Sequence, residues 1–143
     1  MKYLLDTNVL SELVKTFPNQ SVLTKIKLHQ HTITTASVVW HELQYGCHRL
    51  PKSKKRSIIE LFLRNVICTT IPILPYDKHA AKWHAEIRAR LTSKGLTPPF
   101  VDGQIAAIAI TNGLVLVTNN TPDFKCFEGL SMENWHVRKK FKK

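Results

Sequence analysis

Four of the ten acidic residues of this chain stand where clustered carboxylates could perform chemistry. They are Asp6, Glu42, Asp102 and Asp123. Asp6 and Asp123 each follow a predicted strand, and ligands of open α/β sheets gather at that edge of the sheet, where the strand order reverses. Asp102 opens a predicted helix, and Glu42 lies within another. We therefore expect these acids, which are distant in sequence, to meet in one pocket.

Such a pocket would need a divalent cation, because clustered carboxylates repel one another unless a cation compensates their charge. Carboxylate oxygens suit Mg²⁺ or Mn²⁺ better than zinc. One or two such ions could lower the pKa of a bound water and stabilise a leaving oxyanion. The chemistry that the four acids favour is hydrolysis of a phosphodiester.

Each acid also has a purely structural interpretation. Asp6 and Asp102 precede apolar-periodic segments and could be helix N-caps. Glu42 could be a solvated helix residue, and Asp123, next to Pro122, could be an ordinary turn residue. Only the joint placement of the four favours a site, and the residues alone leave both interpretations open.

The elements that must position these acids alternate between strands and helices. Short apolar runs predict strands at residues 2–6, 32–35, 70–73 and 114–118. Apolar residues at helical spacing predict helices at 7–14, 21–28, from 37 onward with an interruption at Gly46, and at 58–66, 77–91 and 102–109. This alternation predicts an α/β fold, a three-layer α/β/α sandwich with a short, mainly parallel sheet of four or five strands.

The chain is strongly basic, since 21 Lys and Arg stand against 10 Asp and Glu and leave a formal net charge of +11. A positive field of this size implies a polyanionic partner. Basic segments at residues 51–56, 88–94 and 138–143 would flank an acidic pocket and attract a phosphodiester backbone. The same charge would suit a non-catalytic basic nucleic-acid-binding module whose acids only cap helices, and this alternative stays open.

The cysteines and the hydropathy indicate a cytoplasmic protein. Cys47, Cys68 and Cys126 are odd in number and include no Cys-x-x-Cys pair, so we expect reduced thiols and no structural zinc site. The apolar run at the N-terminus is too short for a signal peptide, and no 18 consecutive residues are apolar. We therefore expect no association with a membrane.

Other catalytic motifs are absent or incomplete. The run His41-Glu42-Leu43-Gln44-Tyr45 begins like a zinc-protease helix but has tyrosine where the second histidine must stand. The chain contains no Gly-x-Gly-x-x-Gly, no Walker loop and no Gly-x-Ser-x-Gly. Seven histidines could support metal-free acid–base cleavage of RNA, but we expect most of them to be surface or partly packed side chains.

Four segments, in this order and spacing, resemble VapC-type toxins of the PIN-domain ribonuclease family. They are Leu4-Leu5-Asp6-Thr7-Asn8-Val9-Leu10, Ser-Val-Val-x-x-Glu-Leu-x-x-Gly at 37–46, Phe100-Val101-Asp102-Gly103-Gln104-Ile105-Ala106-Ala107, and Val117-Thr118-Asn119-Asn120-Thr121-Pro122-Asp123-Phe124. The resemblance extends along the chain as far as Trp135. It implies that residues 1–137 form a PIN-like nuclease domain and that residues 138–143 are a basic tail.

Residue by residue, the resemblance implies that Asp6, Glu42 and Asp102 bind the metal and that Asp123 is the fourth acid, on the substrate side. Some relatives carry an acid at the position of Asn120. The resemblance also implies a set of polar neighbours that orient the carboxylates by hydrogen bonds. These neighbours are Thr7, Asn8, Ser37, Thr118 and Asn119.

The activity that the resemblance implies is metal-dependent endoribonuclease cleavage by the toxin of a type II toxin–antitoxin pair. Mg²⁺ or Mn²⁺ would be the cofactor, and tRNA or another structured RNA the substrate. A cognate antitoxin would cover the acidic groove, and the toxin would form a homodimer. DNA is the alternative substrate, but the chain has no long insertion for clamping a duplex.

Overall fold

Five short strands form one sheet in this computed structural model, which describes residues 1–136. The strands are β1 (Tyr3–Leu5), β2 (Ile33–Ala36), β3 (Ile73–Leu74), β4 (Val115–Val117) and β5 (Met132–Glu133). Their spatial order is β3-β2-β1-β4-β5, and every neighbouring pair is parallel. The predicted parallel α/β sheet is confirmed, whereas the predicted basic tail at 138–143 lies outside the described residues.

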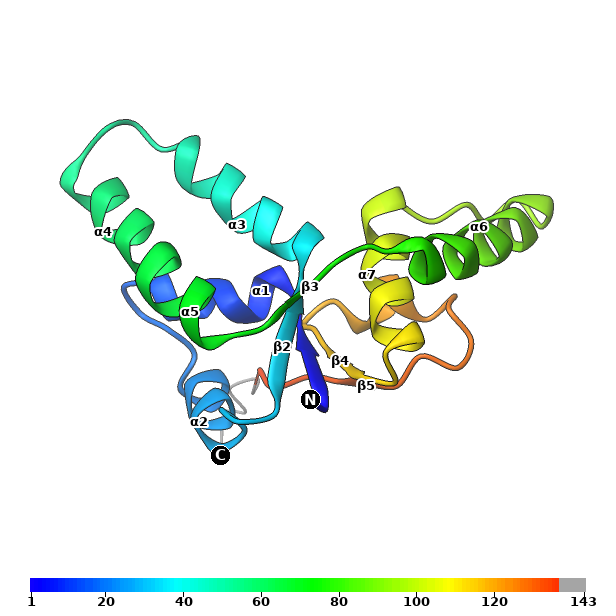
Figure 1. Ribbon diagram of the computed structural model, residues 1–143, viewed down its shortest axis with the longest axis horizontal. Helices are drawn as coiled ribbons and strands as arrows, with labels where there is room; N and C mark the ends of the chain where they lie inside the picture. The colour runs from blue at the N-terminus through cyan, green and yellow to red at the C-terminus, as the bar shows by residue number, and fades with distance from the viewer. Residues whose placement is uncertain (137–143) are drawn as a thin grey trace, which may run out of the picture.

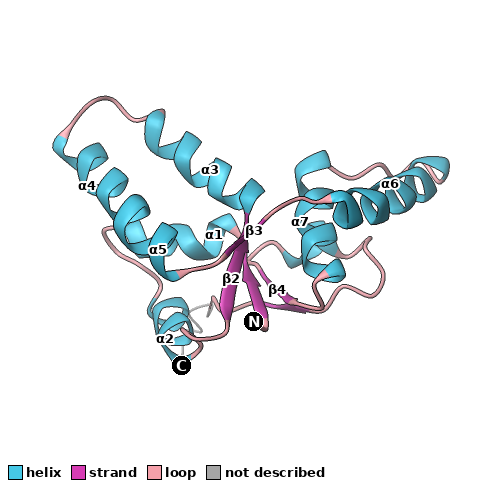
Figure 2. Cartoon of the chain, viewed as in Figure 1, coloured by secondary structure: helices cyan, strands magenta, loops and turns pink. Residues whose placement is uncertain are grey.

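Helices connect the strands and flank the sheet on both sides (Figures 1 and 2). The first connection contains α1 (Thr7–Leu10), the 3₁₀ helix η1 (Ser11–Val14) and α2 (Gln20–Leu28). The second contains α3 (Ser37–His48), α4 (Lys54–Phe62), the π-helix η2 (Leu63–Ile67) and α5 (Cys68–Thr70). The third contains α6 (Lys78–Ser93) and α7 (Phe100–Thr111), and the 3₁₀ helix η3 (Thr121–Phe124) follows β4.

The strand order reverses between β1 and β4. From β1 the chain proceeds outward to β2 and β3, and then returns to place β4 on the other side of β1. In open parallel sheets the crevice outside the carboxyl ends of such a strand pair is where ligands bind. Asp6 follows β1 and Thr118 follows β4, so the topology brings these two residues together at the switch point.

The core lies between the sheet and the helices. Leu4, Leu5, Leu116 and Val117 in the two central strands are buried, as expected for parallel strands covered on both faces. Helix α7 is buried along most of its length, and its small residues Ala106, Ala107 and Ala109 allow it to pack closely. In residues 1–136, no helix has both the length and the apolarity that a membrane span requires.

The strand predicted near residues 70–73 exists but begins only at Ile73, because the preceding helix continues to Thr70 through the π-helical turn of η2. The hydroxyls of Thr69 and Thr70 donate to the carbonyls of Asn65 and Val66, so these β-branched residues remain in the helix. The strand β3 begins only after Pro72.

Two helix boundaries also differ from the prediction. Helix α7 begins at Phe100 after Pro99, so Asp102 lies inside its first turn and is not its N-cap. Helix α3 continues past Gly46 to His48, because Leu43 and Cys47 on either side are buried in the core and offset the cost of a glycine within a helix. The two-residue edge strand β5 was not predicted.

Candidate active site

Asp6 is held at the switch point by contacts from both central strands. Its backbone N–H donates to the carbonyl of Val117 at 3.0 Å, and its side chain is only 6% exposed. Oδ1 accepts from the backbone N–H of Thr7 at 2.8 Å, so Asp6 is the N-cap of α1. Oδ2 accepts from the hydroxyl of Thr118 at 2.8 Å. The capping interpretation is therefore confirmed for Asp6, and its second oxygen faces the end of β4.

The polar neighbours of Asp6 form a network across the sheet edge. Asn8 donates through Nδ2 to Oδ2 of Asp6 at 3.2 Å, and its Oδ1 accepts from the backbone N–H of Asn119 at 2.8 Å. Thr7 donates through its hydroxyl to Oε1 of Glu42 at 2.9 Å, which links α1 to α3. Residues 1–136 provide no hydrogen-bond partner for the Ser37 hydroxyl, so its supporting role stays a prediction.

Burial raises the pKa of Asp6, and its hydrogen bonds from Thr118, Thr7 and Asn8 oppose this effect by stabilising the charged form. Each oxygen of a carboxylate has two lone pairs. The network therefore orients the carboxylate and leaves acceptor capacity for a cation.

Asp102 shows that the four acids influence one another. Partial burial, followed by the negative charges of Asp6, Asp123 and Glu42, raises the pKa of Asp102 to about 6. The elements that carry or follow these acids also pack together, since α3 contacts both α1 and α7, and α7 contacts η3. Asp123 is the exposed member of the group, on η3.

The carboxylates fit a hard divalent cation by their chemistry, although within residues 1–136 no three Asp, Glu, His or Cys side chains are arranged to hold one metal ion. All four groups offer oxygen ligands, as Mg²⁺ and Mn²⁺ prefer. A cation would compensate both the burial and the mutual repulsion that raise the pKa of Asp102.

A buried histidine packs against Gly103, the residue that follows Asp102. His84 on α6 is 2% exposed, and its Nδ1 lies 2.8 Å from the hydroxyl of Tyr76. Its ring covers Gly103, where an added Cβ would lie 2.1 Å from Nε2. Glycine inside a helix is costly, so the pair Asp102-Gly103 was the available signal of a close approach.

The raised pKa of Asp102 predicts how the metal-free protein depends on pH. Below pH 3.8, the ordinary pKa of an aspartate, the Asp102 carboxyl is neutral in both the folded and the unfolded protein. Between pH 3.8 and about 6, it is protonated mainly in the folded protein. The stability that protonated Asp102 contributes is therefore present at low pH and is lost as the pH rises through about 6.

The variant Asp102→Asn tests this pH dependence. With a chelator present, we expect Asp102→Asn to melt at a higher temperature than the native protein at about pH 8, and this difference in melting temperature to narrow towards about pH 5. Thermal melting followed by circular dichroism measures it, and equal melting temperatures at the higher pH would contradict it.

A parallel five-stranded sheet with acidic residues gathered at its switch point defines an α/β protein with a candidate hydrolytic site. The family model of the PIN domain matches residues 3–126, so the chain belongs to the PIN domain family.

Relatives of known sequence or structure resemble the chain over nearly its whole length. The tRNA(fMet)-specific endonuclease VapC of Shigella flexneri is 35% identical and aligns over 94% of this chain and 98% of its own. Toxin FitB of Neisseria gonorrhoeae is 30% identical, over 93% and 98% of the two chains. The crystal structure of DNA-bound VapBC from Salmonella typhimurium matches with a TM-score of 0.82 and 30% identity, over 94% of this chain and 98% of that chain.

Proposed function

We propose that this protein is a metal-dependent endoribonuclease that hydrolyses phosphodiester bonds in RNA as the toxin of a type II toxin–antitoxin pair. The observation that carries the proposal is the packing of α3 against α1 and α7, and of α7 against η3, which gathers the elements of the four acids around the oriented carboxylate of Asp6. The raised pKa of Asp102, caused by burial and then by the charges of the other three acids, agrees with this arrangement. Membership of the PIN domain family and the names of the VapC and FitB relatives support the same activity.

Each acid has a role in this proposal. Asp6 and Asp102 would be the nearest ligands of a Mg²⁺ or Mn²⁺ ion, and Glu42 would support them from α3. The ion would lower the pKa of a water molecule and offset negative charge on the scissile phosphate. Thr118 and Asn8 hold the carboxylate of Asp6 in one orientation by their hydrogen bonds. Asp123, exposed on η3, would position water on the substrate side.

RNA is the proposed substrate. The formal net charge of +11 favours a polyanion, and a phosphodiester backbone is attracted by release of its counterions. The Shigella relative is named for cleavage of a tRNA, which makes tRNA or another structured RNA the first substrate to test. Since such substrates are cytoplasmic, we propose that the protein acts in the cytoplasm.

Calorimetric titration with Mn²⁺, followed by digestion of tRNA and of DNA with and without a chelator, tests this function. We expect a defined Mn²⁺ site, cleavage of tRNA that the chelator abolishes, and little cleavage of DNA. A non-catalytic basic nucleic-acid-binding module would bind RNA without cleaving it and would show no defined metal site. Preferred cleavage of DNA would identify DNA as the substrate instead of RNA, and the proposal of metal-dependent hydrolysis would stand.

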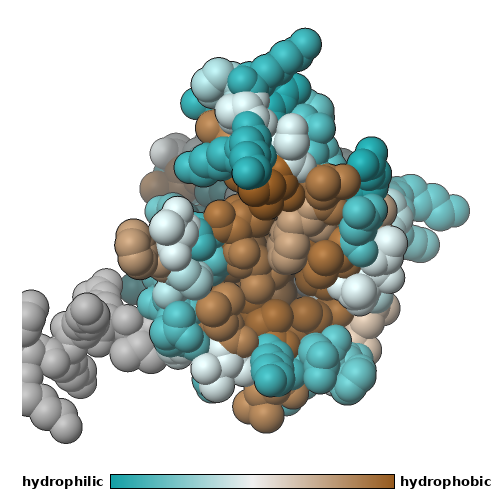
Figure 3. Space-filling view, turned by 90° about the vertical axis from the view of Figure 1, so that its left-hand side faces the viewer, coloured by the Kyte–Doolittle hydropathy of each residue, from teal (hydrophilic) through white to brown (hydrophobic). Residues whose placement is uncertain are grey.

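An apolar surface beside the acidic site is the proposed docking place of the antitoxin. Figure 3 shows apolar side chains surrounded by polar ones on the face that carries α2 and α4. One groove there, of about 600 Å³, is lined by Ile26, Phe62 and Val66, among others. A second lies between α3 and α4 and extends from Leu50 to Glu42.

A segment of the antitoxin lying along this surface would bury the apolar side chains and reach Glu42, which would block the acidic site. Val66 is 41% exposed, so we expect Val66→Lys to leave the fold intact and to weaken copurification with the product of the neighbouring gene. Unchanged copurification would place the antitoxin elsewhere. Lys52→Ala, an exposed change outside both grooves, is the control.

We also propose a homodimer. The loop between α6 and α7 and the start of α7 expose Leu96, Phe100 and Val101, which are 59%, 50% and 39% exposed. A second copy of the chain would cover these side chains, and light scattering of the purified protein measures its mass directly.

A further inference from the structure

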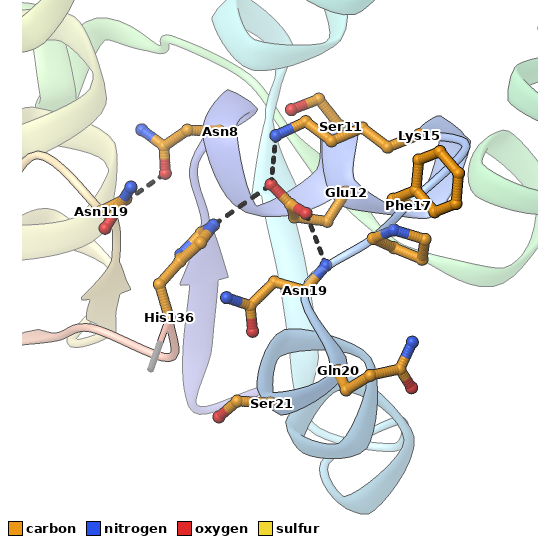
Figure 4. A pocket seen from close by; sticks show the side chains of 11 residues that line it. Asn8, Ser11, Glu12, Lys15, Phe17, Asn19, Gln20, Ser21, Asn119 and His136 are labelled. Carbon is orange, nitrogen blue, oxygen red and sulfur yellow. Dashed lines mark hydrogen bonds and ion pairs between the residues drawn. The ribbon is translucent and has the colours of Figure 1, made fainter. Parts of the chain in front are cut away.

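A second pocket lies beside the acidic site, on the other side of Asn8 (Figure 4). Its volume is about 890 Å³, which is large enough for a small ligand. Asn8 connects the two sites, because its Nδ2 donates to Asp6 and its Oδ1 accepts from the backbone of Asn119, which lines the pocket. A molecule in this pocket would therefore be a neighbour of one bound at the carboxylates.

Glu12 fixes the shape of the pocket. This carboxylate is 3% exposed and accepts from the backbone N–H of Asn19 at 2.8 Å. It also forms an ion pair with Lys15, and Nε2 of His136 lies 3.3 Å from its Oε2 (Figure 4). These contacts hold the loop between η1 and α2 against the segment that follows β5. Because its partners come from the protein itself, Glu12 acts here as a structural anchor.

The loop that Glu12 anchors presents an aromatic ring to solvent. Phe17 is 91% exposed, although burying an apolar ring of this size is strongly favourable. Side-chain amides of Asn19, Gln20 and Asn119 surround the same pocket, and the Lys15 side chain, which is paired with Glu12, is about half exposed at its edge. Asn19 accepts from the N–H of Val22 through Oδ1, which leaves its Nδ2 available.

We propose that this pocket binds one nucleotide of single-stranded RNA adjacent to the scissile phosphate, with its base stacked on Phe17, its base edge bonded to Gln20 and Asn19, and its phosphate near Lys15. The inference rests on the proposed cleavage of RNA at the neighbouring carboxylates. Recognition of single-stranded RNA combines aromatic stacking with hydrogen bonds to base edges, and side-chain amides supply both donors and acceptors.

The lining of the pocket favours a nucleotide over a protein segment. Apart from Phe17 and Pro18, the residues that line it are polar or charged. A protein segment that docks by burying apolar side chains would find walls with a larger apolar share in the grooves beside α4. The pocket also lies in direct continuity with the acidic site through Asn8, as a substrate subsite must.

The test measures RNA binding by fluorescence anisotropy in the Asp102→Asn background, where the RNA should stay intact. We expect Phe17→Ala and Phe17→Leu to bind a short single-stranded oligoribonucleotide roughly tenfold more weakly, and Phe17→Trp to bind as well as the parent. A series of oligonucleotides with one abasic position moved along the strand should contain one that binds the parent weakly. With that oligonucleotide, Phe17→Ala should not weaken binding further, because the base that would stack on Phe17 is already missing.

Controls separate this inference from the proposed function. Leu28→Ala, which changes an exposed apolar side chain at the end of α2 outside the pocket, should leave RNA binding unchanged, and melting curves should show that the Phe17 variants are folded. If the native protein cleaves RNA and Phe17→Ala binds RNA like the parent, the nucleotide pocket is refuted and the nuclease proposal stands. If Phe17→Ala weakens only the binding of the antitoxin, the pocket serves a protein partner and the inference fails. Absence of RNA cleavage by the native protein would overturn both proposals.

Discussion

Asp102→Asn is expected to lose RNA cleavage by more than about a hundredfold, because even an indirect partner of a metal ligand accounts for 10- to 100-fold. The amide keeps the shape of the side chain but removes the charge that would hold a divalent ion. The fold should persist, since the charge of Asp102 is disfavoured in the folded protein, as its raised pKa shows. A gel assay of tRNA cleavage, paired with thermal melting, measures both effects.

Glu86→Gln is the matched control for this change. Glu86 is an exposed acid on α6 that forms an ion pair with Lys82, at 3.8 Å. The variant removes the same unit of negative charge, so any general effect of net charge on RNA binding would appear in it too. Full cleavage by Asp102→Asn would refute the assignment of this acid, and equal losses in both variants would point to a non-specific electrostatic effect.

Gly103→Ala is expected to destabilise the protein by about 1–3 kcal/mol, the range for forcing an added carbon into a packed core. The added Cβ would lie 2.1 Å from Nε2 of His84, and this ring is itself confined by Tyr76 and Phe100. Either the ring or the first turn of α7 must move, and a movement of α7 would displace Asp102. We therefore expect cleavage to fall together with the free energy of unfolding, which urea denaturation measures.

Two further variants identify the cause. Gly46→Ala changes a glycine of α3 that has no atom within 4 Å of its added Cβ, so it should stabilise the protein by about 0.5–1 kcal/mol. In the double variant Gly103→Ala/His84→Ala, the clash disappears, and the total loss should be smaller than the sum of the two single losses. Additive losses would show that Gly103 and His84 do not compete for space.

Most of the fold could be predicted from local patterns. The central strands at β1 and β4 are short apolar runs, and the helices between them have clear periodicity. The prediction failed at residues 70–73, where local hydrogen bonds keep the chain helical as far as Thr70, and at β5, which depends on a tertiary contact. Thr69 and Thr70 resemble strand residues, but their hydroxyls bond back to the helix that precedes them. The two-residue strand β5 exists only because it pairs with β4.

The candidate acids could be predicted because their positions follow from the ends of strands and from the motifs of a family. The supporting roles of Thr118 and Asn8 were also predicted, and both contact Asp6. The contact between His84 and Gly103 was not predicted, since nothing local shows which helix covers α7. The pocket lined by Glu12 was not predicted either. It forms only because His136, at the far end of the described chain, folds back to Glu12.

By itself the sequence determined most of the strands and helices, the formal net charge of +11, and which acids are candidates for catalysis, because hydrophobic period, net charge and residue type are local or additive properties. Tertiary structure decided which of these groups act on one another. The hydroxyl of Thr118 meets Asp6 across 112 positions of sequence, because β4 returns to the side of β1. A pKa of about 6 at Asp102 arises in the same way, since burial and the charges of three distant acids exist only once the sheet and α7 have assembled.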